Sequence, residues 1–204
     1  MTIRLHRGDL PDLSRYTGAV AVDTEAMGLD LQRDRLCVVQ LSPGDGTADV
    51  VQIAAGQTEA PNLARLMADD SKIKIFHFAR FDLGMIQRAL GVMPSPLFCT
   101  RTASRLVRTY TDRHGLKDLA RELLGVDLSK QQQSSDWGAE RLSDAQLAYA
   151  AADVLHLHAL KERLETMLVR EGRTELAQSC FRFLPDRVRL DLAGWADEDI
   201  FAHS

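Results

Sequence analysis

The chain has 204 residues, of which 45% are hydrophobic and 26% are charged, so it can bury a core without disulfides. Its net charge of −4 argues against a broad surface that coats nucleic acid, because such surfaces are usually basic. The three cysteines are widely spaced and include no CxxC pair, which argues against a zinc site. With no secretory signal and no membrane-length apolar run, we expect a cytoplasmic protein with no membrane partner.

The first half of the sequence predicts mainly strands. Apolar runs rich in valine and isoleucine are separated by turn residues, such as those from Pro43 to Gly46. The second, third and fourth elements are joined by short connections, so we expect them to form an antiparallel meander. Pro61 favours the start of one helix and Gly91 the end of another. We expect strands over 3–5, 19–24, 36–41, 48–53 and 73–78, and helices over 61–69 and 79–90.

The second half predicts helices. Ser143 and Gln146 have the spacing of a capping box at the start of the longest helix, which Gly172 should end. Strands first and helices afterwards predict an α/β fold in a single domain over 1–204, sheet-rich over about 1–98 and helical over about 99–204. We expect helices over 100–110, 116–124, 143–171 and 173–183.

Two carboxylates stand close together at the end of the first long strand. Asp23 and Glu25 are two residues apart, and the alternation of side chains along a strand points both to the same face. Like charges this close are costly unless a cation lies between them. Because oxygen ligands suit Mg²⁺ or Mn²⁺, the pair permits a divalent metal site without requiring one.

Two other acids are weaker signals when taken singly. Asp82 falls in the first turns of a predicted helix, where a carboxylate also stabilises the helix dipole. Tyr149 and Asp153 are four residues apart and therefore share one face of a helix, in an apolar segment where an acid needs a partner. A hydrogen-bonded pair on a surface helix would have the same spacing.

Taken together, these residues resemble the DEDD superfamily of exonucleases in their order and spacing. Tyr149 marks the DEDDy branch, since Ala148 stands where a histidine marks the other branch. The resemblance covers residues 19 to about 160 and implies a ribonuclease-H-like fold, a central mixed sheet flanked by helices, here with a helical C-terminal part. It also implies two divalent cations, Mg²⁺ or Mn²⁺. Asp23 would bridge them, Glu25 and Asp153 would hold the one that activates water, Asp82 would hold the other, and Tyr149 would orient the water.

Longer stretches narrow the family. The segments GLKDLARELLGVDLSK, SDW and LSDAQLAYAAADVLHL resemble the catalytic domain of bacterial ribonuclease D. The size of the chain, its HFARFDL segment and its ending WADEDIFAHS are similar to the shorter NrnC (nanoRNase C) family. The resemblance implies a 3′-5′ exoribonuclease that hydrolyses short single-stranded RNA, including dinucleotides, to nucleoside 5′-monophosphates and that assembles as a homo-octamer.

Three alternatives stay open. The first is trimming of the 3′ ends of longer structured RNA, such as tRNA precursors, in the manner of ribonuclease D. The second is a catalytically inactive nucleic-acid-binding or scaffold protein that keeps the fold, which the presence of all four acids and the tyrosine disfavours. The third is a DNA-proofreading subunit, for which the sequence offers no docking feature.

Candidate substrate contacts flank the acids. Main-chain groups of Ala26 and Met27 could hold a terminal ribose, and Met27 or Leu29 could pack on bases, although a lone leucine is more often core. Phe78 could be core and Phe81 could stack on a base, although the sequence alone does not decide between them. Lys130 and Gln133 could reach a phosphate. The candidate substrate-binding residues are Ala26, Met27, Leu29, His77, Phe78, Phe81, Lys130 and Gln133.

Basic residues form a stripe at helical spacing after the predicted strands. Arg101, Arg105 and Arg108 would share one helix face, which is usually solvated. The same stripe could steer phosphates or contact a neighbouring subunit.

Overall fold

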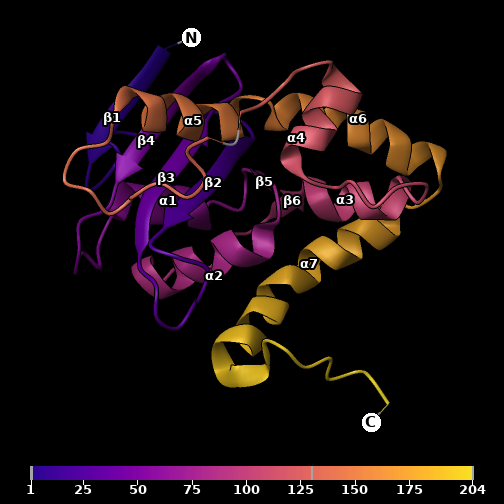
Figure 1. The fold of residues 1–204 in the computed structure, drawn as a ribbon. Helices are drawn as coiled ribbons and strands as arrows, with labels where there is room; N and C mark the ends of the chain where they lie inside the picture. The colour runs from indigo at the N-terminus through magenta and orange to yellow at the C-terminus, as the bar shows by residue number, and fades with distance from the viewer. Residues whose placement is uncertain (1, 130, 204) are drawn as a thin grey trace.

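Six strands form one mixed sheet in the computed structural model, which describes residues 2–129 and 131–203 (Figure 1). The strand order is β1-β4-β3-β2-β5-β6. The predicted meander is confirmed, because β3 pairs antiparallel with both β2 and β4, whereas the other pairs are parallel. The strands are β1 (Thr2–Arg7), β2 (Val20–Ala26), β3 (Leu36–Ser42), β4 (Thr47–Gln52), β5 (Lys74–Phe76) and β6 (Leu97–Cys99).

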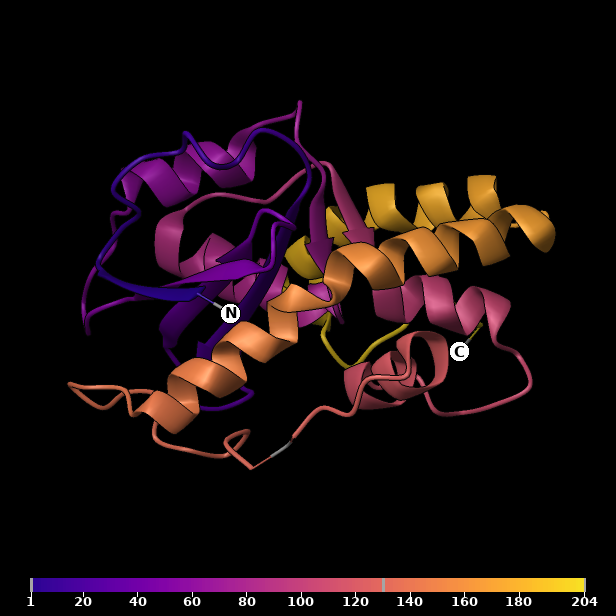
Figure 2. The same ribbon diagram turned by 90° about the horizontal axis from the view of Figure 1, so that it is seen from above.

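Helices cover both faces of the sheet. The views from two directions place α5 on one face and α1 and α2 on the other, while α3, α6 and α7 lie beyond the β5–β6 edge (Figures 1 and 2). The helices are α1 (Pro61–Ala68), α2 (Ala79–Leu90), α3 (Thr100–Val107), α4 (Leu116–Leu119), α5 (Asp144–Leu155), α6 (Leu157–Arg170) and α7 (Thr174–Leu190). None of the described helices is long and apolar enough to cross a membrane.

Two apolar clusters hold these layers together. The larger fills the space between the sheet and α1 and α2 and extends among the helices beyond β5 and β6. The smaller lies under α5 and includes Trp137, which precedes that helix, together with Val38, Val50 and Ala150. The capping box predicted for α5 is present, since Ser143 and Gln146 bond each other's backbone and side chain. The start of α5 is therefore fixed against the sheet.

The structure corrects four helix boundaries. The predicted helix 143–171 divides at His156, because α5 packs on the sheet and α6 packs on α3. The helix expected over 116–124 ends in a π-helical segment, η1 (Ala120–Leu124), and the one expected to reach residue 110 stops at Val107. The last helix runs through Pro185 because Phe181 and Val188 are buried on either side of it, and the π-helical η2 (Asp191–Trp195) follows.

The sheet also departs from prediction at β5 and β6. Strand β6 was not predicted, since three residues between Pro96 and a helix give no alternation to detect. Strand β5 is shorter than the predicted 73–78 because the chain turns at Phe78, which adopts a left-handed conformation with φ of 67°.

Candidate active site

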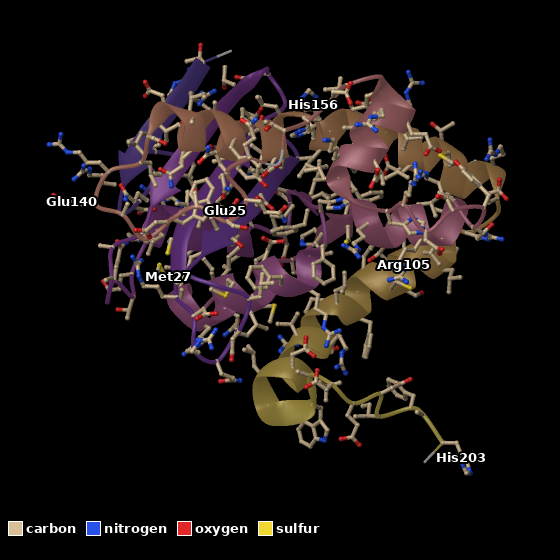
Figure 3. All side chains as sticks on the ribbon, viewed as in Figure 1. Glu25, Met27, Arg105, Glu140, His156 and His203 are labelled. Carbon is tan, nitrogen blue, oxygen red and sulfur yellow. The ribbon has the colours of Figure 1, made fainter. Side chains whose placement is uncertain are left out.

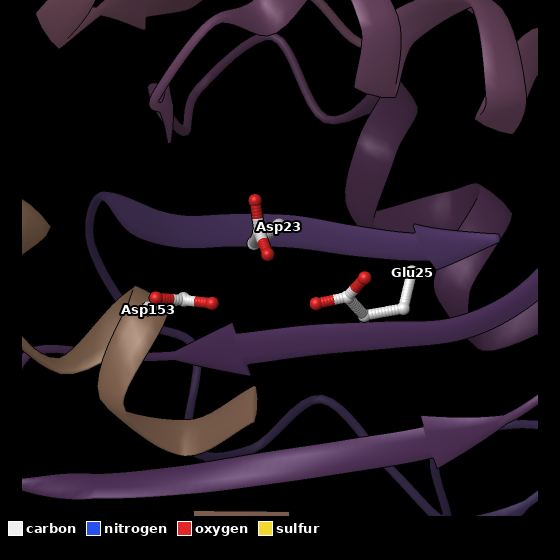
Figure 4. Close-up of side chains that lie close together, drawn as sticks. All are labelled: Asp23, Glu25 and Asp153. Atoms are coloured by element: carbon white, nitrogen blue, oxygen red, sulfur yellow. The ribbon is translucent and has the colours of Figure 1, made fainter. Parts of the chain in front are cut away.

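Three carboxylates meet at the end of β2. Asp23 and Glu25 project from the same face of β2, as predicted, and Asp153 faces them from α5 (Figure 4). One carboxylate oxygen from each of the three residues lies within 4.8 Å of the others. All three side chains are half-buried. The acidic pair predicted on a strand and the acid predicted on a late helix therefore lie next to each other in the structure.

Asp82 approaches the same place from α2. It lies in the first turn of that helix and is 3% exposed. The hydroxyl of Thr24 donates a hydrogen bond of 2.6 Å to Asp82 Oδ1, and both residues line the same cavity as the other three acids. Thr24 was not singled out from the sequence. Its signal is its place between Asp23 and Glu25, because strand alternation turns it toward the opposite face and α2.

A neutral donor also reaches Asp23. The amide of Gln40, on the neighbouring strand β3, lies 3.3 Å from Asp23 Oδ2, and among the described residues its own buried Oε1 has no hydrogen-bond partner. Gln40 was also not predicted as a site residue. Only the pairing of β2 with β3, which sets Gln40 opposite Asp23, identifies it.

Burial raises the pKa values of all four acids, and repulsion from neighbouring carboxylates adds to the rise at Asp23, Glu25 and Asp82. Burial is the largest cause in each case. It holds the pKa of Asp23 well above its ordinary range, with further contributions from Asp82, Asp153 and Glu25. The pKa of Glu25 rises to about 9, and those of Asp82 and Asp153 rise to about 7. A hydrogen bond from Tyr149 partly offsets the rise at Asp153.

Such a cluster favours a bound cation. Within residues 2–129 and 131–203, none of the four carboxylates forms an ion pair with a basic side chain. The donor set is therefore all oxygen and formally anionic, which fits a hard divalent cation such as Mg²⁺ or Mn²⁺.

These pKa shifts give a pH-dependent prediction for Glu25→Gln in metal-free protein. A carboxyl whose pKa rises on folding, from 4.5 to about 9 for Glu25, binds more protons in the folded state than in the unfolded state. The stability contributed by that group is therefore lost as the pH rises from about 4.5 to about 9. We expect Glu25→Gln to have a higher free energy of unfolding than wild type at about pH 8, with the difference shrinking toward about pH 5. Urea denaturation of both proteins in a chelator at several pH values measures this difference in the free energy of unfolding. A difference that does not change with pH would contradict the raised pKa of Glu25 as its cause.

Tyr149 stands one helical turn before Asp153. Its ring packs on that of Trp137, with centroids 6.0 Å apart, and it lines the same cavity. Burial, then the charges of Asp153 and Glu25, raises the pKa of Tyr149 above its usual value. The hydroxyl is therefore a proton donor throughout the neutral range.

The four acids and Tyr149 line one cavity of about 330 Å³. Five of the predicted substrate contacts also line it: Leu29, His77, Phe78, Phe81 and Gln133. Lys130 lies outside the described residues. Further lining residues that were not predicted include Gly115, Leu116, Lys117, Leu128 and Ser129. Lys117 supplies a cationic group there, and its place depends on the tertiary packing of α4 and η1, since η1 packs against α6.

The structure does not bring Ala26 and Met27 into the cavity lining. The N–H of Met27 donates to the carbonyl of Arg35 at 3.1 Å, so it is not free to hold a ribose. Glu25 and Met27 both lie at the end of β2 (Figure 3), but the Met27 side chain packs toward Gly138. The bulge between Glu25 and Ala26 changes which face the following residues present.

The apolar candidates separate by exposure. Leu29 is 85% exposed, so the core interpretation is wrong for this leucine. Phe78 is 46% exposed, and the Arg101 guanidinium lies 4.8 Å from its ring centroid. Phe81 instead packs partly buried against the main core. The expected assignment of core to Phe78 and stacking to Phe81 is therefore reversed, and Phe78 offers the more available ring.

His77 is a neutral imidazole beside these rings. Burial and the nearby Arg101 lower its pKa to about 3. The Thr100 hydroxyl donates to the Phe76 carbonyl at 3.2 Å and lies 2.9 Å from His77 Nδ1.

The predicted arginine stripe is not one surface. Arg101 lines the cavity and Arg105 is exposed on α3 (Figure 3), but Arg108 is fully buried. Helix α3 ends at Val107, and this turns Arg108 inward to bond Glu122 and the Arg113 carbonyl. A role for the three as a shared phosphate-steering or subunit-contact face is therefore wrong.

Comparisons with known proteins point to one family. Residues 10–169 match the family described as 3′-5′ exonuclease. The structure of Brucella melitensis NrnC with bound Mg²⁺ superposes with a TM-score of 0.97 at 63% identity, covering 100% of both chains. Brucella melitensis NrnC bound to pGG superposes with a TM-score of 0.98 at 64% identity, again over 100% of both chains.

A curated relative is more distant. The ribonuclease D of Gluconacetobacter diazotrophicus is 38% identical over 167 residues, which are 82% of this chain and 42% of the relative. The chain spans about two fifths of the length of the curated relatives it matches first. The predicted ribonuclease-H-like fold, with its mixed sheet flanked by helices, is confirmed by the full-length superpositions.

Proposed function

The chain belongs to the 3′-5′ exonuclease family, in its NrnC group, and we propose that it is a two-metal 3′-5′ exoribonuclease for short RNAs, including dinucleotides, acting as one domain. The observation that carries the proposal is the meeting of Asp23, Glu25 and Asp153 within 4.8 Å, beside the buried Asp82. The Mg²⁺ in one solved relative and the pGG dinucleotide in another support the metal and the substrate class.

Each acid has a proposed role that follows from its place. Asp23 is the acid on which the charges of Asp82, Asp153 and Glu25 all act, and by the resemblance to the family it would bridge two cations. Glu25 and Asp153 would complete one site and Asp82 the other. When bound, two divalent cations supply Lewis acidity at the scissile phosphate and lower the pKa of water. Thr24 and Gln40 orient the carboxylates of Asp82 and Asp23 through the hydrogen bonds described above.

Tyr149 positions the attacking water in this proposal. Its raised pKa keeps the hydroxyl protonated, so it does not act as the base. A cation on the Asp153 carboxylate would leave the hydroxyl proton, which Asp153 accepts in the metal-free protein, to be donated to the water. In-line attack by water, whose proton passes to solvent, breaks the bond between phosphorus and the 3′ oxygen of the preceding nucleotide. This releases a nucleoside 5′-monophosphate and leaves a 3′-hydroxyl on the remaining chain or nucleotide.

The cavity lining suggests how a short RNA is held. Leu29 would pack on a base, and the exposed face of Phe78 would stack on one, since every base has an apolar face. Arg101, Lys117 and Gln133 would contact phosphate oxygens. These contacts lie at one cavity of about 330 Å³, which favours a substrate of a few nucleotides.

Trimming of longer structured RNA is the second candidate, because the curated relatives are ribonucleases D. Hydrolysis of short RNA and trimming of structured RNA can be distinguished by an assay with Mg²⁺ or Mn²⁺. Its substrates are end-labelled single-stranded RNAs from two to roughly twenty nucleotides and a tRNA precursor. The proposal expects kcat/KM to be highest for the dinucleotide. Equal or faster turnover of the longest or structured RNA would instead support trimming in the manner of ribonuclease D.

We further propose that the protein is cytoplasmic and assembles as a homo-octamer. Large exposed apolar side chains support self-association, among them Val169, Leu176, Trp195 and Phe201. Multi-angle light scattering measures the assembly directly, and a monomer at micromolar concentration would contradict it.

A further inference from the structure

We propose that Gly84 and Arg88 of α2 are positioning residues that seat the loop 27–35 and so fix Leu29 over the cavity. The inference rests on the proposed function, because it takes Leu29 to contact the substrate base. Neither Gly84 nor Arg88 lines the cavity that holds the acids. They would act on substrate binding only through the loop.

The loop is first held by its own hydrogen bonds. The N–H of Met27 donates to the Arg35 carbonyl and closes the loop at its base. Asp30 Oδ1 accepts from the N–H of Gln32 at 2.8 Å, and Asp34 Oδ2 accepts from the N–H of Asp30 at 3.0 Å. These bonds leave few alternative conformations to the segment that carries Leu29.

The loop then docks onto α2 at a glycine. A Cβ on Gly84 would lie 2.7 and 2.9 Å from the two methyl carbons of Leu31, closer than Cβ contacts in real proteins, so the Leu31 side chain would have to shift. Only glycine therefore lets Leu31 approach the helix this closely. Arg88, one turn further along α2, donates to the carbonyls of Leu31 and Asp34. Two independent contacts thus fasten the loop to the helix that carries Asp82.

The opposite side of the loop meets the segment before α5. A Cβ on Gly138 would lie 2.4 Å from Met27 Sδ, and Arg35 Nη2 lies 3.4 Å from the Gly138 carbonyl. The loop is therefore joined to both parts of the chain that supply acids from outside β2. Leu29, at 85% exposure, is held toward solvent by a segment that is otherwise anchored. An apolar side chain fixed in this way is pre-organised for a ligand and contributes nothing to the core.

The first test is Gly84→Ala, assayed by steady-state hydrolysis of a dinucleotide with Mg²⁺. The new methyl group displaces Leu31 and with it Leu29, so we expect KM to rise about tenfold, the scale of one lost base contact, while kcat changes by less than about threefold. Gly18→Ala is the matched control, because a Cβ there meets nothing within 4 Å. Arg88→Met, at an exposed side chain that should not disturb folding, is the second variant and should raise KM several-fold. An unchanged KM in both variants would overturn the inference.

Double variants show whether the effect passes through the loop. Leu31→Ala removes the side chain that Gly84→Ala would strike, so the double variant should have the KM of Leu31→Ala alone. In a Leu29→Ala background, Gly84→Ala should add no further increase. A KM effect of Gly84→Ala that persists undiminished in either background would mean that it acts through Asp82, and would overturn the inference. If the wild-type protein does not hydrolyse the dinucleotide, the proposed function itself is rejected. If the wild-type protein does hydrolyse it and the variants have an unchanged KM, only the proposed role of Gly84 and Arg88 in seating the loop is rejected.

Discussion

Asp153→Asn is expected to abolish hydrolysis of a dinucleotide, lowering kcat by at least about a thousandfold. The substitution keeps the size of the side chain but removes one of the three carboxylates that meet within 4.8 Å. Loss of a metal ligand forfeits several kcal/mol of charge stabilisation in the transition state, and about 1.4 kcal/mol corresponds to tenfold in rate.

The same variant should remain folded. Burial raises the pKa of Asp153 to about 7, so its charge is a cost to the metal-free protein that asparagine does not incur. We expect the variant to have a Tm in chelator equal to or above that of wild type. Added Mg²⁺ should raise the Tm of wild type much more than that of the variant, because a cation that binds only the folded state stabilises it.

Asp144→Asn is the matched control for this prediction. Asp144 lies on the same helix, at its exposed first turn and away from the cavity. It should retain wild-type kcat. Wild-type turnover by purified Asp153→Asn, or an equal Mg²⁺-dependent rise in Tm, would remove Asp153 from the metal site.

Tyr149→Phe should lower kcat about a hundredfold with little change in KM. Phenylalanine keeps the packing on Trp137 and loses only the hydroxyl, which we place on the attacking water. Because the pKa of Tyr149 lies above its usual value, the hydroxyl donates at every pH of the assay. The shape of the profile of kcat against pH should therefore be the same in the variant and in wild type.

A pH profile separates this role from that of a general base. If Tyr149 accepted the proton from water, its removal would abolish a limb of the profile, and that result would contradict the donor role. Tyr110→Phe is the control, since Tyr110 is exposed and donates to Glu122 outside the cavity lining. It should leave both kcat and the profile unchanged.

The acids could be placed from the sequence because two short-range regularities position them. Strand alternation puts Asp23 and Glu25 on one face, and the four-residue spacing puts Tyr149 and Asp153 on another. Asp82 was predictable only through the resemblance, since its local pattern also fits a dipole-stabilising acid. The structure brings all five to one cavity, and their catalytic roles stay a prediction.

The supporting residues could not be predicted, because they depend on pairing between distant segments. Gln40 reaches Asp23 only through the register of β2 with β3, and Thr24 reaches Asp82 across the interface with α2. Arg108 follows helical spacing in sequence, yet the end of α3 turns it into the interior. Leu29 is the opposite case to Arg108. A leucine is expected in the core, but the anchored loop holds Leu29 exposed to solvent.

The fold was predictable where a segment is long and periodic. The meander of β2, β3 and β4 and the start of α5 follow from alternation, turn residues and the capping box. Strand β6 is too short to carry a pattern. Helix α7 passes Pro185 because burial of Phe181 and Val188 outweighs the one hydrogen bond that proline removes.

The measurement that tests the two-metal site most directly is anomalous diffraction from crystals soaked with Mn²⁺ and a hydrolysis-resistant dinucleotide. We predict two peaks roughly 4 Å apart, with Asp23 contacting both, Glu25 and Asp153 contacting one, and Asp82 contacting the other. A map without peaks at these carboxylates, or with a single peak that Asp23 does not touch, would contradict the account.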